Sequence, residues 1–338
     1  MADMKNENVR LYQPGRRQPR IAAIGGGHGL SAMLRGLKRY TKHITAIVTV
    51  ADDGGGSGML REDLGMLPPG DIRNCIMALA NTEPTMEQLI NYRFTEGSLS
   101  GQSFGNLFLA AMNGISGSFD ETVQRMGDVL AITGRVLPVT NQNVHLEAEL
   151  DDGTRVLGES KIFYAKKISD CRIRQVRLVP EHPQALADSI RAIREADIIV
   201  IGPGSLYTSI IPNFLVDGIC EAVAQSGAVR EYILNIMTQD GETDGYTGED
   251  HVRALLEHAG SVVDVCIANN QPVPEKYLSP YRQEGVQQIL LDAQETARIE
   301  KMGVAVRQFA LCAPGRYIRH DHDALSRAIL SVWQESLG

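Results

Sequence analysis

The feature that most constrains the fold is a short apolar run that ends in glycines near the N-terminus. Residues 21–24 (IAAI) are uninterrupted apolar residues, and residues 25–29 (GGGHG) follow directly. A short apolar run bounded by glycine predicts a strand buried on both faces, as in a parallel sheet. Apolar residues then recur at helical spacing from Leu30 to Leu37. The chain therefore opens with a strand, a glycine turn and a helix.

The same alternation of strands and helices recurs along the chain. Residues 44–50 are rich in β-branched residues and predict a second strand, which completes a βαβ unit. Further strands are predicted at 197–201, 232–236 and 262–268, and helices at 72–79, 104–114, 120–131 and 325–333. The fold class is therefore α/β, with a Rossmann-like, mostly parallel sheet and helices on both faces. Asp71 and Asp323 are expected to cap the helices that follow them.

One segment departs from this pattern. Four apolar residues between Val144 and Leu150 alternate with polar ones, and Asp152-Gly153 marks a tight turn. This arrangement is typical of a β-hairpin and predicts a small inserted antiparallel β lobe. The predicted organisation is a disordered tail at 1–19, a first part of the core at 20–135, the β lobe at 136–180 and the remaining core at 181–338.

Composition narrows the functional classes. The 338 residues carry a formal net charge of −8 without a basic cluster, so nucleic acid is not an expected partner. No apolar run approaches the ~18 residues of a membrane span, and the N-terminus lacks the apolar segment of a secretory signal. The five cysteines form no C-x-x-C pair, which indicates free thiols in a reducing compartment. We therefore expect a cytoplasmic protein.

The first glycine loop has the form of an anion-binding turn. Backbone N–H groups at a helix N-terminus attract negative charge, because these donors are unpaired and the helix dipole is positive there. Residues 27–32 fit the pattern G-x-G-x-x-A between a strand and a helix, the context in which the pattern binds phosphate. Gly26, Gly27, His28 and Gly29 are therefore candidate phosphate ligands. A glycine turn used only for packing is the alternative.

Two acidic residues follow the second strand. A dinucleotide enzyme uses an acid at this position to bind the ribose, so Asp52 and Asp53 keep an NAD-binding oxidoreductase open. They lead into residues 54–58 (GGGSG), however, and an adenosine ribose needs no second glycine loop. Gly55 and Ser57 are candidates to contact a ligand that lies across both loops. Alternatively, the two carboxylates hold Mg²⁺ beside a diphosphate, or they cap the next helix.

Three more polar loops are expected at the ligand edge of the sheet. Residues 202–209 follow a buried strand, and their candidate ligands are Gly202, Pro203, Gly204, Ser205, Tyr207 and Thr208. In residues 101–106, Ser103 or Asn106 binds a base or sugar, or caps the following helix. In residues 242–247, Asp244 is a further candidate. Ser205 has the same two alternatives, ligand contact or helix cap.

Motifs of known catalytic chemistry are missing. The sequence has no G-x-S-x-G elbow, no H-E-x-x-H and no Walker A motif. Residues 320–323 (HDHD) resemble a metal cluster, but they begin the terminal helix and are interpreted as a solvated cap. No catalytic residue is therefore assigned.

Five segments, in order, resemble the gluconeogenesis factor family (YvcK-like). They are residues 24–30, 47–55, 68–74, 202–209 and 237–246. The family is grouped with the 2-phospho-L-lactate transferases, and the resemblance implies their CofD-like fold, a Rossmann-like core with an added lobe. It also implies binding of UDP-N-acetylglucosamine or a related nucleotide diphosphate, and regulation of cell shape and peptidoglycan synthesis under gluconeogenic growth. Cell-wall synthesis proteins are then the candidate partners, and oligomeric state stays open.

The resemblance also assigns residues to the nucleotide cleft. Carried over by position, residues 26–29, Asp52 and Asp53, Asn74, Asn106 and residues 202–205 line it. Tyr277 and Arg319 match a tyrosine and an arginine that the family uses for the nucleotide sugar. An arginine can grip a diphosphate with two parallel hydrogen bonds, and a tyrosine can stack on uracil.

This chain departs from the family pattern at three positions. His28 stands where the family usually has threonine, Gly56 where it often has serine, and Gln102 where it often has histidine. The backbone cradle at His28 is unaffected by the change of side chain. Gln102 removes a titratable group, which counts against acid–base catalysis there. Two alternatives to a nucleotide-sugar-binding regulator remain, a phospholactyl transferase and an NAD-binding oxidoreductase.

Overall fold

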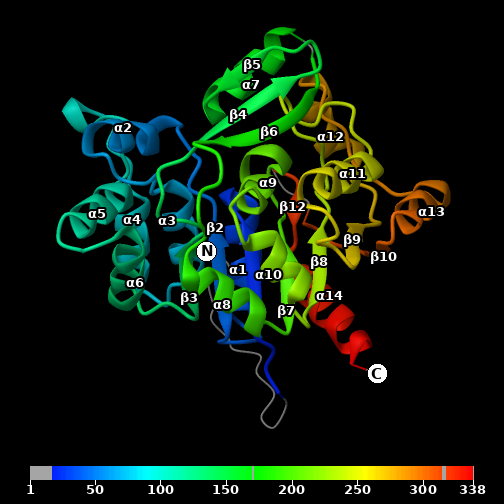
Figure 1. The fold of residues 1–338 in the computed structure, drawn as a ribbon, viewed down its shortest axis with the longest axis horizontal. Helices are drawn as coiled ribbons and strands as arrows, with labels where there is room; N and C mark the ends of the chain where they lie inside the picture. Colours follow the sequence, from blue (N-terminus) through cyan, green and yellow to red (C-terminus); the bar gives the residue numbers. More distant parts are fainter. Residues whose placement is uncertain (1–16, 170, 314–316, 338) are drawn as a thin grey trace.

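A seven-stranded parallel sheet forms the centre of the protein (Figure 1). The computed structural model describes residues 17–169, 171–313 and 317–337. The strands are β1 (Ile21–Gly25), β2 (Ile44–Val48), β3 (Arg135–Pro138), β7 (Ile198–Ile201), β8 (Val229–Ile233), β9 (Val265–Asn269) and β10 (Ala305–Phe309). Their order is β10-β9-β8-β7-β1-β2-β3. The predicted α/β class is confirmed.

The strand order reverses at β1. The chain runs from β1 to β2 and β3 on one side, and then returns to place β7 against the other side of β1. Right-handed crossovers that run in opposite directions put helices on opposite faces of a sheet. A crevice opens between β1 and β7 at their carboxyl ends, where open α/β sheets bind ligands.

Helices cover both faces of the sheet. α1 packs against α3 and α14, while α8 packs against α10, and α11 against α9 and α13. The helices are α1 (Gly27–Leu37), α2 (Gly55–Leu64), α3 (Gly70–Leu79), α4 (Pro84–Asn91), α5 (Phe104–Asn113), α6 (Phe119–Val129), α8 (Ala187–Glu195), α9 (Ile211–Phe214), α10 (Ile219–Gln225), α11 (Gly248–Ala259), α12 (Glu275–Gln283), α13 (Ala293–Lys301) and α14 (His322–Ser336). Shorter elements are η1 (Gly97–Leu99), the π-helical turn η2 (Leu206–Ile210), and the paired strands β11 (Cys312–Ala313) and β12 (Arg319–His320).

The core explains why these segments fold as they do. Every residue of β1, β2 and β7 is buried, as expected for parallel strands covered on both faces. On α1, Leu30, Met33, Leu34 and Leu37 are at most 1% exposed, so the predicted apolar stripe faces the sheet. Burying each such side chain contributes about 1.5–3 kcal/mol to stability.

The predicted β lobe is present and lies beside the main sheet (top of Figure 1). Its central strand β4 (His145–Leu150) pairs antiparallel with β5 (Arg155–Leu157) and β6 (Ile173–Val179). Burial alternates along β4, which confirms that one face of the hairpin is packed. The helix α7 (Glu159–Ser169) follows β5 and was not apparent from the sequence.

The structure corrects several sequence-based boundaries. Residues 136–138, expected in the lobe, form β3 at the edge of the main sheet, because Val136 to Pro138 pair with β2. The strand predicted at 232–236 is β8, which ends at Ile233. Its last predicted residues leave the sheet and reach the ligand edge. The strand predicted at 262–268 is likewise shifted, to Val265–Asn269.

The cap of the last helix is also corrected. Asp321, rather than Asp323, caps α14 by accepting the Ala324 N–H at 2.7 Å. Asp323 instead pairs with Arg39 of the α1–β2 connection. A cap residue directly precedes the helix, so a cap at Asp323 predicts a helix that starts at Ala324, whereas α14 starts two residues earlier, at His322.

The N-terminal tail was predicted to be disordered. Its residues 1–16 lie outside the described residues. Within residues 17–19, Arg17 pairs with Asp197, and the Pro19 carbonyl accepts the Thr41 hydroxyl at 2.9 Å.

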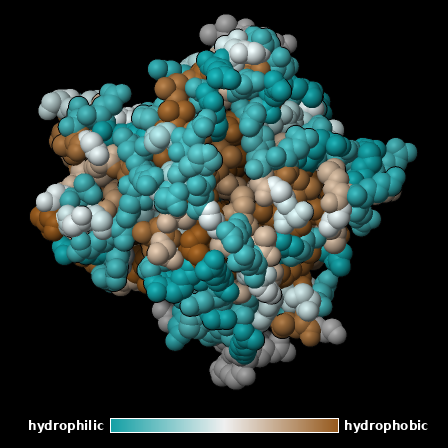
Figure 2. Space-filling model, in the orientation of Figure 1, coloured by the Kyte–Doolittle hydropathy of each residue, from teal (hydrophilic) through white to brown (hydrophobic). Residues whose placement is uncertain are grey.

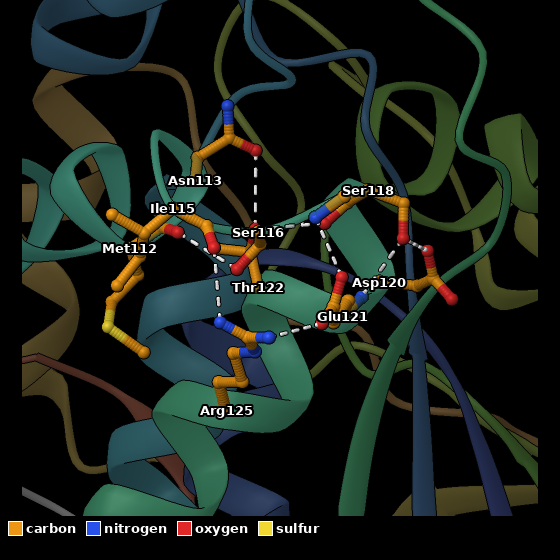
Figure 3. A network of polar contacts seen from close by, with 10 residues as sticks. Met112, Asn113, Ile115, Ser116, Ser118, Asp120, Glu121, Thr122 and Arg125 are labelled. Atoms are coloured by element: carbon orange, nitrogen blue, oxygen red, sulfur yellow. Dashed lines mark hydrogen bonds and ion pairs between the residues drawn. The ribbon is translucent and has the colours of Figure 1, made fainter.

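The helices predicted at 104–114 and 120–131 are α5 and α6, and a polar network joins them (Figure 3). Arg125 donates to the Ile115 carbonyl at 3.1 Å and to Glu121 at 2.6 Å. Ser118 caps α6 by accepting the Glu121 N–H. The turn is thus fixed by local contacts that satisfy the exposed ends of both helices.

Figure 2 shows a largely hydrophilic face on which hydrophobic residues form separate patches. No helix among the described residues is long and apolar enough to cross a bilayer.

Candidate functional site

A cavity of about 470 Å³ lies at the crevice between β1 and β7. The loop after β1 contributes residues 27–29, and the loop after β7 contributes residues 203–205. Residues 235–239, which follow β8, form a third side, and residues 318–320 with the start of α14 form a fourth. Of the sequence-predicted ligands, Gly27, His28, Gly29, Asp52, Pro203, Gly204, Ser205 and Arg319 line this cavity.

The two glycine loops touch at the mouth of the crevice. A Cβ atom at Gly29 would lie 2.5 Å from the Pro203 carbonyl oxygen, and one at Gly204 would lie 3.2 Å from the Gly26 oxygen. Gly27 has a φ of +68°, in the left-handed region that favours glycine. These glycines are therefore required by close backbone approach, which brings the N-terminus of α1 against the second loop.

Asp71 does not cap α3, as the sequence suggested. It lies in the first turn of that helix, whose N-cap is Pro69. Its carboxylate instead accepts the N–H of Gly27, the first residue of α1. Burial, followed by the nearby Asp52 charge, raises the pKa of the Asp71 carboxyl to about 6, although the Gly27 N–H and Arg73 act in the opposite direction. A titratable carboxyl thus occupies the helix end that was predicted to attract phosphate.

Asp52 and Asp53 point to different parts of the molecule. Asp52 lines the cavity and accepts the Gly54 N–H at 2.8 Å, and burial raises the pKa of its carboxyl. Asp53 accepts the Ser160 N–H of α7 at 2.8 Å, so it ties the lobe to the core. Ser57 bonds the Asp52 carboxylate. The two carboxylates therefore do not converge as a ready pair for Mg²⁺.

The loop after β7 is held by three polar side chains. Asn235 donates to the Gly204 carbonyl at 2.7 Å and accepts the Gly204 N–H at 3.2 Å. Ser205 does not cap η2; its hydroxyl donates to Gln239 at 2.7 Å. The buried Glu242 accepts the N–H groups of Tyr207 and Thr208 at 2.6 and 3.0 Å. The backbone that faces the cavity is thus fixed from behind.

Positive charge approaches the cavity from two elements. Arg319 lies on β12 and lines the cavity, and Arg73 lies on α3. Burial, followed by the charges of Arg319 and Arg73, lowers the pKa of His28. His28 is therefore a weaker base than a free histidine, and Arg319 and Arg73 supply positive charge beside it.

Ser103, Asn106 and Asn74 lie near Arg73, with Ser103 and Asn106 buried and Asn74 and Arg73 half-buried. Ser103 caps α5 by accepting the Asn106 N–H at 3.2 Å, so the capping alternative is correct for this residue. Arg73 donates to the Ser103 hydroxyl at 2.5 Å and to Asn74 at 2.7 Å. Asn106 is 4% exposed. This cluster supports Arg73 rather than lining the cavity.

Four other predicted residues also lie off the cavity lining. The Tyr207 hydroxyl lies 2.9 Å from that of Tyr246, toward α11. Asp244 accepts the Gly241 N–H at 3.1 Å. Tyr277 packs in a small apolar cluster with Ile236 and Ile318, behind the cavity wall. Gly202 is buried beneath the loop, with a φ of +79°.

A second cavity of about 350 Å³ adjoins the first below the lobe, and we call it the α7 cleft. Both cavities are lined by Asp52, Glu159, Ser205 and Gln239. The α7 cleft is also lined by Gly54, Gly55, Ser160, Ile162, Phe163, Tyr164, Thr208, Gly241 and Glu242. The predicted ligands Gly55 and Thr208 therefore face this cleft, while Asp52 and Ser205 face both cavities.

Sequence reasoning predicted Asp52 but did not identify Glu159 and Glu242 as site residues. Burial, and then the charges of Asp52, Asp71 and Glu242, raises the pKa of Glu159 well above its usual value. Burial also raises the pKa of Glu242 to about 7. No local motif marks Glu159, whereas the loop at residues 242–247 was predicted at the ligand edge with Asp244, and not Glu242, as its candidate. Within residues 17–169, 171–313 and 317–337, no three His, Cys, Asp or Glu side chains are grouped as a metal site.

Comparisons with known proteins find matches that extend over most of the chain. The family model described as "2-phospho-L-lactate transferase CofD" matches residues 21–312. A protein from Thermoanaerobacterium thermosulfurigenes is 52% identical over 315 residues, covering 93% of this chain and 97% of that protein. The gluconeogenesis factor of Bacillus subtilis (strain 168) is 46% identical over 323 residues, covering 94% of this chain and 99% of that protein. A crystal structure of a UPF0052 family protein from Bacillus halodurans is 45% identical, with a TM-score of 0.87 over 92% of this chain and 99% of that one.

Proposed function

The chain belongs to the 2-phospho-L-lactate transferase CofD family, and on that premise we propose that it binds UDP-N-acetylglucosamine in the cavity between β1 and β7. The observation that carries the proposal is the meeting of two glycine loops at the reversal point of the sheet. Such a crevice is where this kind of sheet binds nucleotides. The cavity volume of about 470 Å³ is within the range of small-molecule sites.

The cavity lining suits a diphosphate that is bound by backbone N–H groups and by a guanidinium group. The N-terminus of α1 presents backbone N–H groups and a positive dipole end to the cavity. Arg319 faces the same space from β12, and its planar group can bond two phosphate oxygens. Asn235 and Glu242 keep the second loop in place through hydrogen bonds to its backbone. The diphosphate would therefore be bound by residues that move little.

We infer from the relatives that the bound ligand serves regulation. The Bacillus subtilis relative is named a gluconeogenesis factor, which supports a role in growth on gluconeogenic carbon. The family resemblance extends this role to cell shape and peptidoglycan synthesis, in the cytoplasm, through contact with cell-wall synthesis proteins. The nucleotide sugar would report the supply of wall precursor.

Titration calorimetry of the whole protein with UDP-N-acetylglucosamine tests the binding. Arg319→Ala should weaken binding by about 1.5–3 kcal/mol, the value of a hydrogen bond to a charged group. Arg125→Ala is the matched control, because Arg125 lies on α6 and pairs with Glu121 away from the cavity. No heat at millimolar ligand would reject the proposal, and an equal effect of both variants would reject the role of Arg319.

A transferase is the second candidate function. The family model bears a transferase name, and Asp71 and Glu159 line the cavity with carboxyl groups whose pKa is raised. Such groups are suited to holding a proton near neutral pH. Asp52 and Asp71 are the residues that would hold a Mg²⁺ ion, which would neutralise diphosphate charge. Incubation with an activated lactyl guanosine diphosphate, Mg²⁺ and a deazaflavin acceptor, followed by mass spectrometry, should then give the phospholactyl product.

The NAD-binding alternative has less support. Asp52, the acid that follows β2, accepts the Gly54 N–H and bonds Ser57. Its carboxylate is therefore already hydrogen-bonded within its own loop. Mixing with NADH and recording its fluorescence checks this alternative directly.

A further inference from the structure

The α7 cleft and the nucleotide cavity form one continuous site. They have four lining residues in common, and one of these, Glu159, comes from the inserted lobe. The other three come from the loops after β2, β7 and β8. A ligand whose diphosphate lies at the glycine loops can therefore extend into the cleft with the group attached to its second phosphate.

The two ends of this site differ in chemistry. Arg319 and the backbone N–H groups of α1 lie at the cavity end, as expected for an anion. Among the described residues, the lining of the cleft end contains no arginine or lysine and includes Glu159 and Glu242, whose carboxyl groups can exchange hydrogen bonds with a ligand. The cleft therefore suits a neutral group that brings hydrogen-bond donors.

Glu242 provides an unsatisfied polar atom in the cleft lining. Its Oε1 atom accepts two backbone N–H groups, whereas its Oε2 atom is buried and has no hydrogen-bond partner among the described residues. Glu242 is only 2% exposed. A buried carboxyl oxygen without a partner is costly unless a ligand or water supplies one.

Aromatic side chains of α7 also line the cleft. Phe163 and Tyr164 of α7 lie edge to face, with ring centroids 5.4 Å apart. Tyr164 is 64% exposed, and the Phe163 ring covers Gly241, where a Cβ would lie 2.6 Å from it. Aromatic rings and carboxyl groups in one cleft can together bind a hexose, because the rings pack against its apolar face while the carboxyls bond its hydroxyls.

We propose that the α7 cleft is the sugar subsite, so that the inserted lobe selects the sugar and the α/β core binds the diphosphate. This inference rests on the proposed binding of a nucleotide sugar. It assigns a function to the lobe, which the parallel sheet does not need for its own strand pairing.

The experiment compares two ligands on one set of variants. UDP-N-acetylglucosamine and UDP are titrated into the wild type, Tyr164→Ala and Phe163→Ala. Tyr164→Ala should lower the affinity for UDP-N-acetylglucosamine about five-fold, the order of a lost aromatic contact, and leave the affinity for UDP unchanged. Phe163→Ala should act in the same direction, with its melting temperature recorded because Phe163 also packs on Gly241.

Tyr92→Ala is the matched control, since Tyr92 is also an exposed tyrosine with an edge-to-face phenylalanine neighbour, at 5.1 Å, but lies outside the cleft lining. It should change neither affinity. Equal losses for both ligands in Tyr164→Ala, or no loss for either, would overturn the sugar subsite while leaving nucleotide binding intact. If the wild type binds neither ligand, the proposed function fails and the subsite fails with it.

Discussion

Asp71 shows how a single residue can be misread from sequence. Its position just inside a helix predicts a cap, and helix ends do favour such residues. The structure turns its carboxylate toward Gly27, which is 44 positions earlier in the chain. Sequence patterns report neighbours along a helix or strand, so they do not reveal a contact between two distant loops. For the same reason Glu159 was not predicted, although it lines both cavities.

Asp71 should make ligand binding depend on pH. When ionised it opposes a diphosphate at the N-terminus of α1, and when protonated it does not. Since its pKa is about 6, affinity for UDP-N-acetylglucosamine should fall as pH rises through that value. Asp71→Asn keeps an acceptor for Gly27 and removes the charge, so at pH 8 it should bind on the order of five-fold more tightly than the wild type.

Calorimetry in metal-free buffer at pH 5 and pH 8 measures this difference. At pH 5 the wild type and Asp71→Asn should bind alike. Weaker binding by the variant at pH 8 would mean that the carboxylate assists the ligand instead of repelling it.

Gly29 is a second residue whose role can be measured. Alanine there would place a Cβ atom 2.5 Å from the Pro203 oxygen, and two backbone segments would have to separate. We expect Gly29→Ala to lower the free energy of unfolding by about 1–3 kcal/mol, as overpacking typically does. Gly227→Ala is the control, because nothing lies within 4 Å of its Cβ position. Urea denaturation of both variants checks the prediction, which a small loss at Gly29 would contradict.

At the scale of the element, the apolar pattern of the sequence predicts those strands that are set by local burial. β1, β2 and β7 were predicted correctly, because a short run of consecutive apolar residues is compatible with few structures other than a buried strand. β3 was assigned to the lobe because its sequence gives no sign of the strand it pairs with, and that pairing with β2 is non-local. β8 was extended too far because Leu234 and Ile236 are buried without belonging to the strand. Burial alone therefore does not locate the end of a strand.

The anchoring of α7 gives a prediction about one element. Asp53 lies outside α7, yet it accepts a backbone N–H in the first turn of that helix. Capping bonds of this kind contribute about 1 kcal/mol. Asp53→Ala should therefore speed hydrogen exchange within residues 159–165 and leave β1 and β7 protected.

Hydrogen exchange followed by mass spectrometry resolves these segments. Asp63→Ala, at an exposed position on α2, is the control and should leave every segment unchanged. If exchange rises throughout the sheet in Asp53→Ala, the residue stabilises the whole core and not only the lobe helix.

At the scale of the whole molecule, the site is a consequence of topology. The reversal at β1 brings together loops that are about 175 residues apart, the first at Gly27 and the second at Gly202. The lobe then closes one side of the crevice through Glu159 and Asp53. The sequence could predict both loops and the lobe, because each has its own local pattern. Their meeting place follows only from the strand order.

The same arrangement brings buried titratable groups together. The free energy of unfolding should therefore depend on pH, and parts of that dependence can be assigned to single residues. Glu242 has a folded pKa of about 7, raised mainly by burial, against an unfolded value of about 4.5. Between these values the folded state binds more protons than the unfolded state, so this residue's contribution to stability falls as pH rises and is constant above pH 8. Buried His320, whose pKa burial lowers to about 4, acts in the opposite sense as pH rises toward 6.5.

Because His320 acts in the opposite sense, the difference in stability between the wild type and a Glu242 variant is more informative than either pH curve alone. Glu242→Gln retains an acceptor for Tyr207 and Thr208 and cannot ionise. Its stability relative to the wild type should increase from pH 4.5 to pH 8 by about 1–3 kcal/mol and then stay level. Chemical denaturation at half-unit pH steps measures that difference. A difference that is independent of pH would mean that the Glu242 carboxyl has the same pKa in the folded and unfolded states, so that burial does not raise it.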